Sequence, residues 1–213
     1  MTAAGSTDGR VARGERTRTA VLRRSADIAS IDGLDGVSIG RLAADLSVSK
    51  AGVFARFGSK EDLQLATIHA AAERFTAEVV APALDAPEGL SRLVALYDRW
   101  LDYSRRRVFP GGCFFACTFA EFHARPGRVR DELAAVRFRW LAAGAGLVAA
   151  ARDRGELDPD CDPDAVAFEL DALGMAANLH DQLCDDPGGF DRARDAMVGR
   201  LRALATAPHP ALD

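Results

Sequence analysis

Apolar residues recur at spacings of three and four along almost the whole chain, which is the periodicity of one face of an α-helix. The first clear example places Val21, Leu22, Ala26 and Ala29 on one face. No stretch shows the strict alternation of apolar and polar residues that marks a half-buried strand. The sequence therefore predicts an all-α fold of about nine helices.

Serine, glycine and proline residues divide these helical stretches. Ser38, Ser49 and Ser59 each stand just before a helical stretch, where a serine hydroxyl can accept a free backbone N–H group. Gly33 and Gly58 interrupt the pattern, as glycines at helix ends do. Later breaks predict that the fourth helix runs towards Pro82 and that five more follow, at about 88–107, 111–124, 128–154, 163–185 and 188–206.

Length and composition fit an ordinary globular protein. Of the 213 residues, 48% are hydrophobic and 27% are charged. No uninterrupted apolar run approaches the roughly 18 residues that span a bilayer, and the polar, Gly-rich N-terminus lacks the apolar segment of a signal peptide. We therefore expect a cytoplasmic protein without a membrane partner, in which residues 1–14 form a disordered arm.

The four cysteines, at positions 113, 117, 161 and 184, show no Cys-x-x-Cys spacing. In a reducing cytoplasm such cysteines are free thiols rather than disulfide bridges. Cysteine and histidine residues nowhere show the spacing of a zinc site. The sequence therefore predicts no bound metal and no cofactor.

The formal net charge of −4 conceals an asymmetry along the chain. Residues 1–60 hold 10 Lys and Arg against 6 Asp and Glu, whereas the remaining residues hold 17 against 25. A basic N-terminal unit on an acidic body can approach phosphate groups with one end only. This charge distribution favours a nucleic-acid partner at the N-terminal end.

Residues 38–57 predict two short helices joined by a tight corner, which is the pattern of a helix-turn-helix. Its expected core consists of Ile39, Leu42, Ala43, Leu46, Val53, Phe54 and Phe57. The outer face keeps small residues, which let a helix enter the major groove, while Lys50 and Arg56 can reach phosphates or a guanine edge. The pattern alone fits a plain helical hairpin with a solvated charged face equally well.

The stretch SIGRLAADLSVSKAGVFARFGSKEDL resembles the DNA-binding domain of the TetR family of transcriptional regulators. The resemblance begins in the first helix, at TAVLRRSADIA, includes the turn at Gly33, and runs without a gap from about residue 15 to residue 75. It implies a DNA-binding domain over 15–75 and an effector-binding and dimerisation domain over 76–213.

The resemblance also implies which residues contact double-stranded operator DNA: Ser38, Arg41, Ser49, Lys50, Gly52, Phe54, Arg56 and Lys60. Two of these positions depart from the family pattern. Gly52 stands where threonine is common, and Phe54 stands where a tyrosine hydroxyl often touches phosphate. With fewer hydroxyls on the reading face, we expect specificity to depend more on the remaining side chains and on DNA shape.

Ten of the fifteen aromatic residues lie between positions 97 and 140. This cluster predicts either a packed core or the wall of a cavity for an aromatic or lipophilic effector, and one residue can serve both. The family resemblance implies a cavity in this region. The candidate lining residues are Trp100, Tyr103, Phe114, Cys117, Phe119, Phe122, His123 and Trp140.

Cys113 stands near a predicted helix N-terminus, where the helix dipole lowers the pKa of a thiol. It is interpreted either as a redox or electrophile sensor or as a small buried apolar residue. An enzyme with Cys113 as nucleophile and His123 as base would need an orienting carboxylate, and none is identifiable. We therefore predict that the chain is not an enzyme.

The last two predicted helices have the composition of an interface. Residues 163–185 are apolar on most faces, which is typical of a helix buried from two sides. The family resemblance implies that this pair dimerises as a four-helix bundle. The candidate interface residues are Leu173, Met197, Leu201 and Leu204.

These expectations describe a homodimeric repressor that a small, largely apolar effector releases from a palindromic operator, because two-fold protein symmetry matches a palindrome. Two alternatives stay open. One is a DNA-binding regulator without small-molecule input, and the other is a thiol-based sensor acting through Cys113.

Overall fold

The computed structural model describes residues 5–213, in which nine helical stretches and no β-strand occur. This arrangement confirms the predicted all-α fold. The helices are α1 (Gly5–Asp32), α2 (Ile39–Asp45), α3 (Lys50–Phe57), α4 (Lys60–Phe75) with its continuation α5 (Ala81–Ala83), α6 (Leu90–Arg105), α7 (Phe114–Phe122), α8 (Arg128–Asp153), α9 (Pro163–Cys184) and α10 (Gly188–Leu204). A short 3-10 turn, Pro210–Leu212, follows α10.

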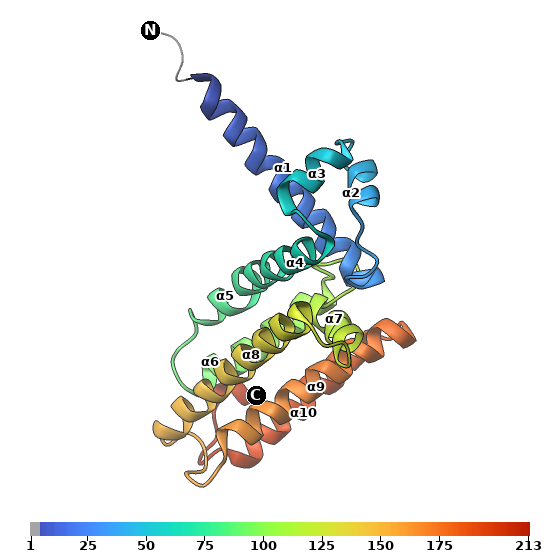
Figure 1. The fold of residues 1–213 in the computed structure, drawn as a ribbon. Coiled ribbons are helices and arrows are strands. Elements are labelled where there is room, and N and C mark those ends of the chain that lie inside the picture. The colour runs from blue at the N-terminus through green and yellow to red at the C-terminus, as the bar shows by residue number, and fades with distance from the viewer. Residues whose placement is uncertain (1–4) are drawn as a thin grey trace.

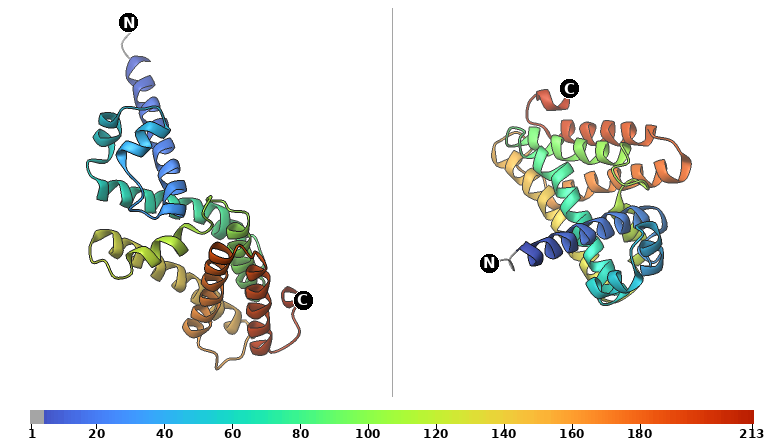
Figure 2. Two further views of the ribbon diagram at one scale, coloured as in Figure 1. Left: turned by 90° about the vertical axis from the view of Figure 1, so that its right-hand side faces the viewer. Right: turned by 90° about the horizontal axis from the view of Figure 1, so that it is seen from above.

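Two units make up the molecule (Figure 1). Helices α1 to α3 and the first turns of α4 form a small N-terminal unit, and the remaining helices form a larger body. In the body α9 packs against both α10 and α8, while α8 also contacts α4 and α6. Figure 2 shows α2 and α3 at the end of the molecule remote from α9 and α10.

Serine caps fix the starts of α2, α3 and α4, as the sequence predicts. The hydroxyl oxygens of Ser38, Ser49 and Ser59 accept the backbone N–H groups of Arg41, Gly52 and Asp62 at 3.1, 3.0 and 3.0 Å. Each cap of this kind contributes about 1 kcal/mol. Local chemistry therefore sets these three helix starts.

Helix α1 is longer than the sequence predicts, because it begins at Gly5. The expected disordered arm is therefore wrong for residues 5–14, and residues 1–4 lie outside the described part of the chain. Extending an existing helix adds one hydrogen bond for each residue that is ordered, whereas starting a helix is costly. The packed part of α1, around Val21 and Ile28, supplies that start.

The aromatic cluster forms much of the core of the body. Tyr103, Phe109 and Phe114 are fully buried. The ring of Phe75 meets those of Tyr103 and Trp140 edge to face, with centroids 5.4 and 5.2 Å apart. Edge-to-face packing is the favoured geometry for aromatic pairs. The core interpretation of the cluster therefore holds for these residues.

A π-helical turn, Thr76–Val80, joins α4 to α5 without interrupting the rod. Its backbone hydrogen bonds skip five residues rather than four, so one extra residue is accommodated in the turn. Such turns are rare and occur frequently at functional sites.

Helix α8 is long and apolar enough, by length and composition alone, to cross a membrane, with a hydropathy of 1.4 over its best 18-residue window. The apolar part of α8 is interrupted by Arg137 and Arg139, so no uninterrupted apolar run marks it in the sequence. Length and composition are weak evidence, because the core helix of a helical bundle has the same properties. The absence of a membrane partner and the cytoplasmic location stay predictions.

Candidate DNA-binding face and effector cavity

Helices α2 and α3 form a helix-turn-helix at the end of the molecule remote from α9 and α10 (Figure 1). The corner between them is turned at Ser47, whose φ of 53° lies in the left-handed region. Val53 and Phe57 are buried on the inner face of α3. The opposite face of α3 is exposed, as a helix that enters a DNA groove requires.

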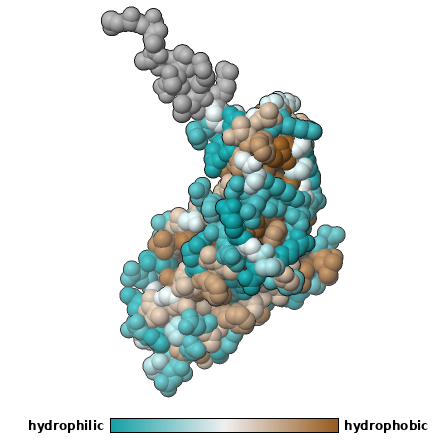
Figure 3. Space-filling view, in the orientation of Figure 1, coloured by the Kyte–Doolittle hydropathy of each residue, from teal (hydrophilic) through white to brown (hydrophobic). Residues whose placement is uncertain are grey.

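The structure corrects the expected position of Phe54, which is not part of the core. Its side chain is 55% exposed, because Val53 and Phe57 already define the inner face and Phe54 lies about 100° around the helix from Val53. A hydrophobic patch interrupts the hydrophilic surface where α2 and α3 lie (Figure 3). Phe54 therefore lies on the predicted reading face as an apolar side chain.

The basic residues predicted to contact DNA fall into two groups. Lys50 and Arg56 are exposed and have no carboxylate partner among the described residues. Arg56 instead donates from Nη1 to the carbonyl oxygen of Gly52, at 2.7 Å. Arg41 and Lys60 are paired with Asp32 and Asp35, with nitrogen–oxygen distances of 2.5 and 3.5 Å. Lys50 and Arg56 can therefore contact phosphate directly, whereas Arg41 and Lys60 must first leave their carboxylate partners.

Glycine at position 52 leaves room for the helix cap. A β-carbon there would lie 2.9 Å from the hydroxyl oxygen of Ser49, which accepts the Gly52 N–H group. Glycine inside a helix costs about 1 kcal/mol relative to alanine. The departure from threonine at this position is thus compatible with the local geometry of α3.

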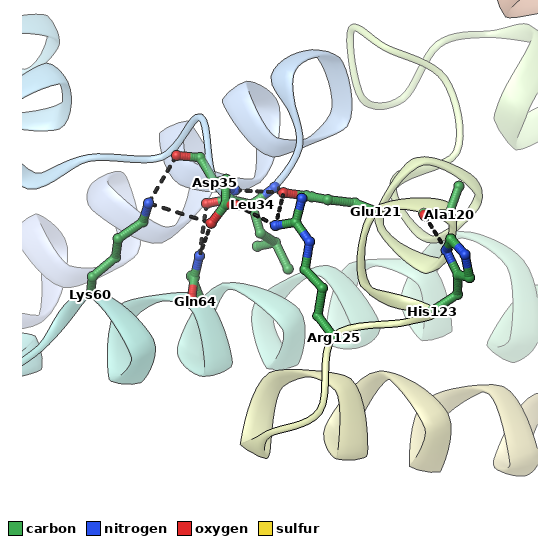
Figure 4. A network of polar contacts seen from close by, with 8 residues as sticks. All are labelled: Leu34, Asp35, Lys60, Gln64, Ala120, Glu121, His123 and Arg125. Carbon is green, nitrogen blue, oxygen red and sulfur yellow. Dashed lines mark hydrogen bonds and ion pairs between the residues drawn. The ribbon is translucent and has the colours of Figure 1, made fainter.

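The turn between α1 and α2 is held by α7 and α4 (Figure 4). The Glu121 carboxylate on α7 accepts the N–H groups of Leu34 and Asp35, at 2.7 and 2.9 Å. Gln64 on α4 donates to the carbonyl oxygen of Leu34 at 3.0 Å. Arg125 pairs with Asp35, and hydrogen bonding to this guanidinium lowers the pKa of the Asp35 carboxyl. Neither Gln64 nor Glu121 is among the residues predicted from the sequence.

A second contact between the two units lies at the start of α8. Arg128 donates from Nη1 to Glu61 and Asp62 in the first turn of α4, at 3.0 and 3.1 Å. Hydrogen bonds from Ser59 and from Arg128 lower the pKa of the Asp62 carboxyl. The N-terminal unit is therefore fastened to the body on both sides of the α7–α8 loop.

A cavity of about 230 Å³ lies among α4, α6, α7, α8 and α9. Most of its wall is apolar. The lining residues are Ala72, Phe75, Thr76, Val80, Trp100, Cys113, Phe115, Phe119, Val136, Arg137, Arg139, Trp140, Ala143, Asp171 and Met175. A mostly apolar cavity with a few polar groups is the usual form of a small-molecule site.

One ion pair supplies most of the polarity of the cavity wall. Arg137 donates to both carboxylate oxygens of Asp171, and the indole N–H of Trp140 donates to the same carboxylate at 3.0 Å. The Asp171 side chain is only 1% exposed. The indole N–H of Trp100 is fully buried beside the Cys113 thiol. The polar part of the wall is therefore mainly a satisfied ion pair.

The structure brings together three of the eight residues predicted for the effector cavity. Trp100, Phe119 and Trp140 line it. Three others, Tyr103, Phe114 and Phe122, are buried elsewhere in the core. Cys117 is half-buried outside the cavity. His123 is exposed just beyond α7, with its Nδ1 atom near the carbonyl oxygen of Ala120. Those five predictions are wrong about the lining.

Sequence reasoning missed several residues that line the cavity. Phe75 lies on α4, outside the aromatic-rich segment between positions 97 and 140. Phe115 has a detectable signal, because it stands four residues before Phe119 and so shares a face of α7. Asp171 gave no signal, since its partner Arg137 lies 34 residues away.

Cys113 lines the cavity, but its environment is opposite to the one predicted from the helix dipole. The residue is buried, and burial raises the pKa of its thiol. Burial also raises the pKa of Cys117. A buried thiol with a raised pKa is a poor nucleophile. The structure thus favours the interpretation of Cys113 as a small buried residue.

The outer face of α9 and α10 differs from the predicted interface. Met197 and Leu201 are 3% and 2% exposed, and Leu173 and Leu204 pack against the same core. The apolar stripe of α10 is thus used within the chain. The exposed stripe, hereafter the α9 stripe, consists of Phe168, Ala172, Ala176, Leu179 and Leu183, with Ala196, Gly199 and Ala203 exposed on α10.

Phe168, Leu179 and Leu183 are 59%, 63% and 77% exposed. Large apolar side chains that share one helix face in this way mark an interaction surface. In the described part of the chain, no three histidine, cysteine or acidic residues are grouped so that they could hold a metal ion.

A helix-turn-helix with an exposed basic face, joined to a helical body that contains a mostly apolar cavity, is the architecture of a DNA-binding transcriptional regulator. The sequence profile of the bacterial regulatory proteins of the tetR family matches residues 22–67. The profile of the tetracyclin repressor-like C-terminal domain matches residues 89–197, which is more than half of the chain. The chain belongs to the TetR family of DNA-binding transcriptional regulators.

Solved structures show the same fold. A TetR transcriptional regulator from Chloroflexus aurantiacus is 24% identical with a TM-score of 0.84, over 91% of this chain and 98% of that one. A TetR-family regulator from Cytophaga hutchinsonii is 19% identical with a TM-score of 0.82, over 92% and 98%. AibR, solved with isovaleryl coenzyme A and operator DNA, is 22% identical with a TM-score of 0.68, over 89% and 99%. No curated protein matches the sequence.

Proposed function

We propose that this regulator is a homodimeric repressor that leaves a palindromic operator when a small molecule occupies the cavity. The cavity carries this proposal, because it lies among helices that also contact the DNA-binding unit. Bound effector would favour a conformer with a different spacing of the two α3 helices. Their spacing must match successive major grooves, about 34–36 Å apart.

The α9 stripe supports the homodimer. Its large apolar side chains lie next to small exposed residues on α10, so a second copy can approach closely about a two-fold axis. Closed two-fold dimers are the commonest symmetric assembly, and the same surface serves both copies. We therefore move the proposed interface from Leu173, Met197, Leu201 and Leu204 to the outer face of α9 and α10.

The effector that fits the wall is compact and mostly apolar. Because Arg137 and Asp171 already pair with each other, neither is free to stabilise a charged ligand in the cavity. The structure of AibR with isovaleryl coenzyme A supports a small-molecule effector for a relative of this fold.

On the DNA side, the proposed contacts are the exposed Lys50, Arg56, Ser49 and Phe54, with Ser38, Arg41, Gly52 and Lys60 beside them. The domain division proposed from the sequence, 15–75 and 76–213, fits this arrangement, although the α4 rod continues into the body.

A cytoplasmic location without membrane attachment and the absence of enzymatic activity belong to the same proposal. The buried state of Cys113 gives no support to a thiol sensor.

In vitro selection of the full-length protein on random duplex DNA tests the DNA-binding part. The expected result is an enriched inverted repeat whose half-sites are separated by about one helical turn, 10–10.5 bp, or a multiple of it. Recovery of no preferred sequence would contradict the proposal. A thermal-shift screen of small apolar molecules then tests the effector part, since a ligand that binds only the folded state raises Tm. The hits are expected to weaken binding to the selected duplex by about 5–150-fold.

A further inference from the structure

We propose that Glu121 is the positioning residue through which occupancy of the cavity reaches the helix-turn-helix. This inference rests on the proposed function and assigns a particular carboxylate to the regulation of the same cavity. It follows from three features of the structure: the two-sided placement of α7, the hydrogen bonds of Glu121, and the close approach of the α6–α7 loop to α1.

Helix α7 has one face in the cavity wall. Phe115 and Phe119, one turn apart, both line the cavity, and their ring centroids are 5.6 Å apart. The guanidinium of Arg137 lies over the Phe119 ring at 5.5 Å. A ligand that presses on either ring therefore presses on α7. Because α7 is a short hydrogen-bonded helix, we expect displacement of these rings to move its last turn as well.

The last turn of α7 carries Glu121, whose side chain is 15% exposed (Figure 4). Its two carboxylate oxygens bind the N–H groups of two successive residues, Leu34 and Asp35, in the α1–α2 turn. Hydrogen bonds from N–H groups to a carboxylate are shorter and about twice as strong as neutral ones. Asp35 lies three residues before Ser38, the N-cap of α2, so the carboxylate holds the turn that leads into the helix-turn-helix.

Gly33 shows how closely the two units approach here. Its φ of 75° lies in the left-handed region, and a β-carbon would stand 2.5 Å from the Glu121 Oε2 atom. The loop before α7 makes a second close approach, where Gly111 donates its N–H to the Ser30 hydroxyl at 3.0 Å. A β-carbon at Gly111 would overlap the Ser30 carbonyl oxygen. The end of α1 is thus fixed at both ends of α7.

Other contacts at this junction are weaker candidates for the link. Arg125 pairs with Asp35, but both side chains are more than half exposed, and exposed pairs contribute little. Gln64 holds the Leu34 carbonyl from α4, which also lines the cavity through Ala72 and Phe75. An experiment must therefore separate a route through α7 from a route through α4.

A double-mutant cycle makes this separation without a known effector. V136F fills the cavity from α8 and serves as a surrogate for bound ligand, because Val136 lines the cavity. E121Q keeps the size of the side chain but replaces one acceptor oxygen by a donor group, so one of the two amides loses its partner. The affinity for the selected duplex is measured for the wild type, both single variants and the double variant.

We expect V136F to weaken DNA binding by about 5–150-fold in the wild-type background, the usual range for coupled sites. In the E121Q background the ratio is expected to fall towards one. Hydrogen exchange at the amides of Leu34 and Asp35 is expected to become faster in both single variants. The exchange measurement also decides the matter if E121Q fails to fold, because V136F alone must then accelerate exchange at these two amides.

The chain offers a matched control in the body. Glu156 accepts the N–H of Leu90 at 2.6 Å beside Gly89, whose φ is 90°, so it caps a backbone turn in the same manner. The E156Q variant loses a comparable hydrogen bond but lies away from the helix-turn-helix. The effect of V136F is expected to be as large in the E156Q background as in the wild type.

Each outcome is informative. An equal V136F ratio with and without Glu121 would overturn the proposal and would favour a route through α4 or through Arg128 at the start of α8. A ratio of one in the wild-type background, or unchanged exchange at Leu34 and Asp35, would also overturn it. Failure of the selection to yield any preferred DNA would instead contradict the proposed function, so the two failures are distinguishable.

Discussion

The guanidinium of Arg137 forms a two-pronged contact with the carboxylate of Asp171 across the wall of the cavity. The two partners are unequally exposed, since the side chain of Arg137 is 28% exposed and that of Asp171 is 1% exposed. Loss of either partner therefore has a different physical consequence, because only Arg137 can turn to water.

We predict that R137M destabilises the fold more than D171N. The first variant leaves a buried carboxylate with the Trp140 N–H as its remaining donor, and removing one partner of a buried pair costs about 3–5 kcal/mol. The second leaves a guanidinium that can become solvated. Urea unfolding with matched m values measures the difference in the free energy of unfolding. Equal losses in the two variants would contradict this account.

The unpaired cations of α3 give a prediction about salt. K50A and R56A are each expected to weaken DNA binding, and each lost phosphate contact lowers the slope of log K against log salt by about 0.9. Fluorescence anisotropy on the selected duplex at several salt concentrations measures the slope. R99A removes an exposed charge from the body and serves as the control. An unchanged slope in both α3 variants would mean that the reading face lies elsewhere.

The α9 stripe gives a prediction about assembly. L179E and L183E are expected to yield folded monomers, because a charge placed at an apolar interface must be desolvated when the dimer forms. Light scattering coupled to gel filtration measures the mass. L84E introduces the same charge at an exposed leucine outside the stripe and is expected to leave the dimer intact. Dimeric L179E and L183E would exclude this face as the interface.

M197A provides the complementary test on α10. Met197 is buried within the chain, so its truncation is expected to lower the free energy of unfolding by about 2–5 kcal/mol. The dimer mass should be unchanged at concentrations where the variant is folded. A folded monomer would instead restore Met197 to the interface.

The cysteines give a prediction about pH. Burial raises the pKa of the Cys113 thiol, so the thiolate stays scarce at pH values where an ordinary cysteine already ionises. Maleimide is expected to label the exposed Cys184 first, and labelling of Cys113 is expected to stay slow through pH 8 and to rise only at higher pH. Unfolded protein, in which all four cysteines are accessible, is the control. Native-state labelling of Cys113 as fast as that of Cys184 would revive the sensor hypothesis.

The helix-turn-helix was largely predictable from the sequence, because its determinants are local. Ser38, Ser49 and Ser59 cap the helices that directly follow them. The exception is Phe54, which was included in the predicted core but is exposed. Val53 and Phe54 are adjacent and both apolar, so the sequence alone does not show which of them faces inward.

The cavity and the interface were less predictable, because they depend on which helix each amphipathic face meets. The stripe containing Met197 and Leu201 has the same pattern whether its partner is another helix of the chain or a second copy. The cavity joins Phe75 to Asp171, which lie far apart in sequence. Glu121 binds backbone amides, which every residue except proline carries. No particular side chain in the sequence therefore points to its partner.

The helical rod that begins at Lys60 beside the reading head ends at Ala83, after its π turn has passed the cavity. Each residue of an α-helix turns the following part by about 100°. Adding or deleting one residue between Thr76 and Val80 would therefore rotate Val80 and α5 away from their neighbours, whereas Ala72 and Phe75, which come earlier in the rod, would keep their register with the reading head. Substitutions in this segment change local packing, whereas a change in its length would break the register between the part of the cavity wall on α4 and the part that follows the π turn.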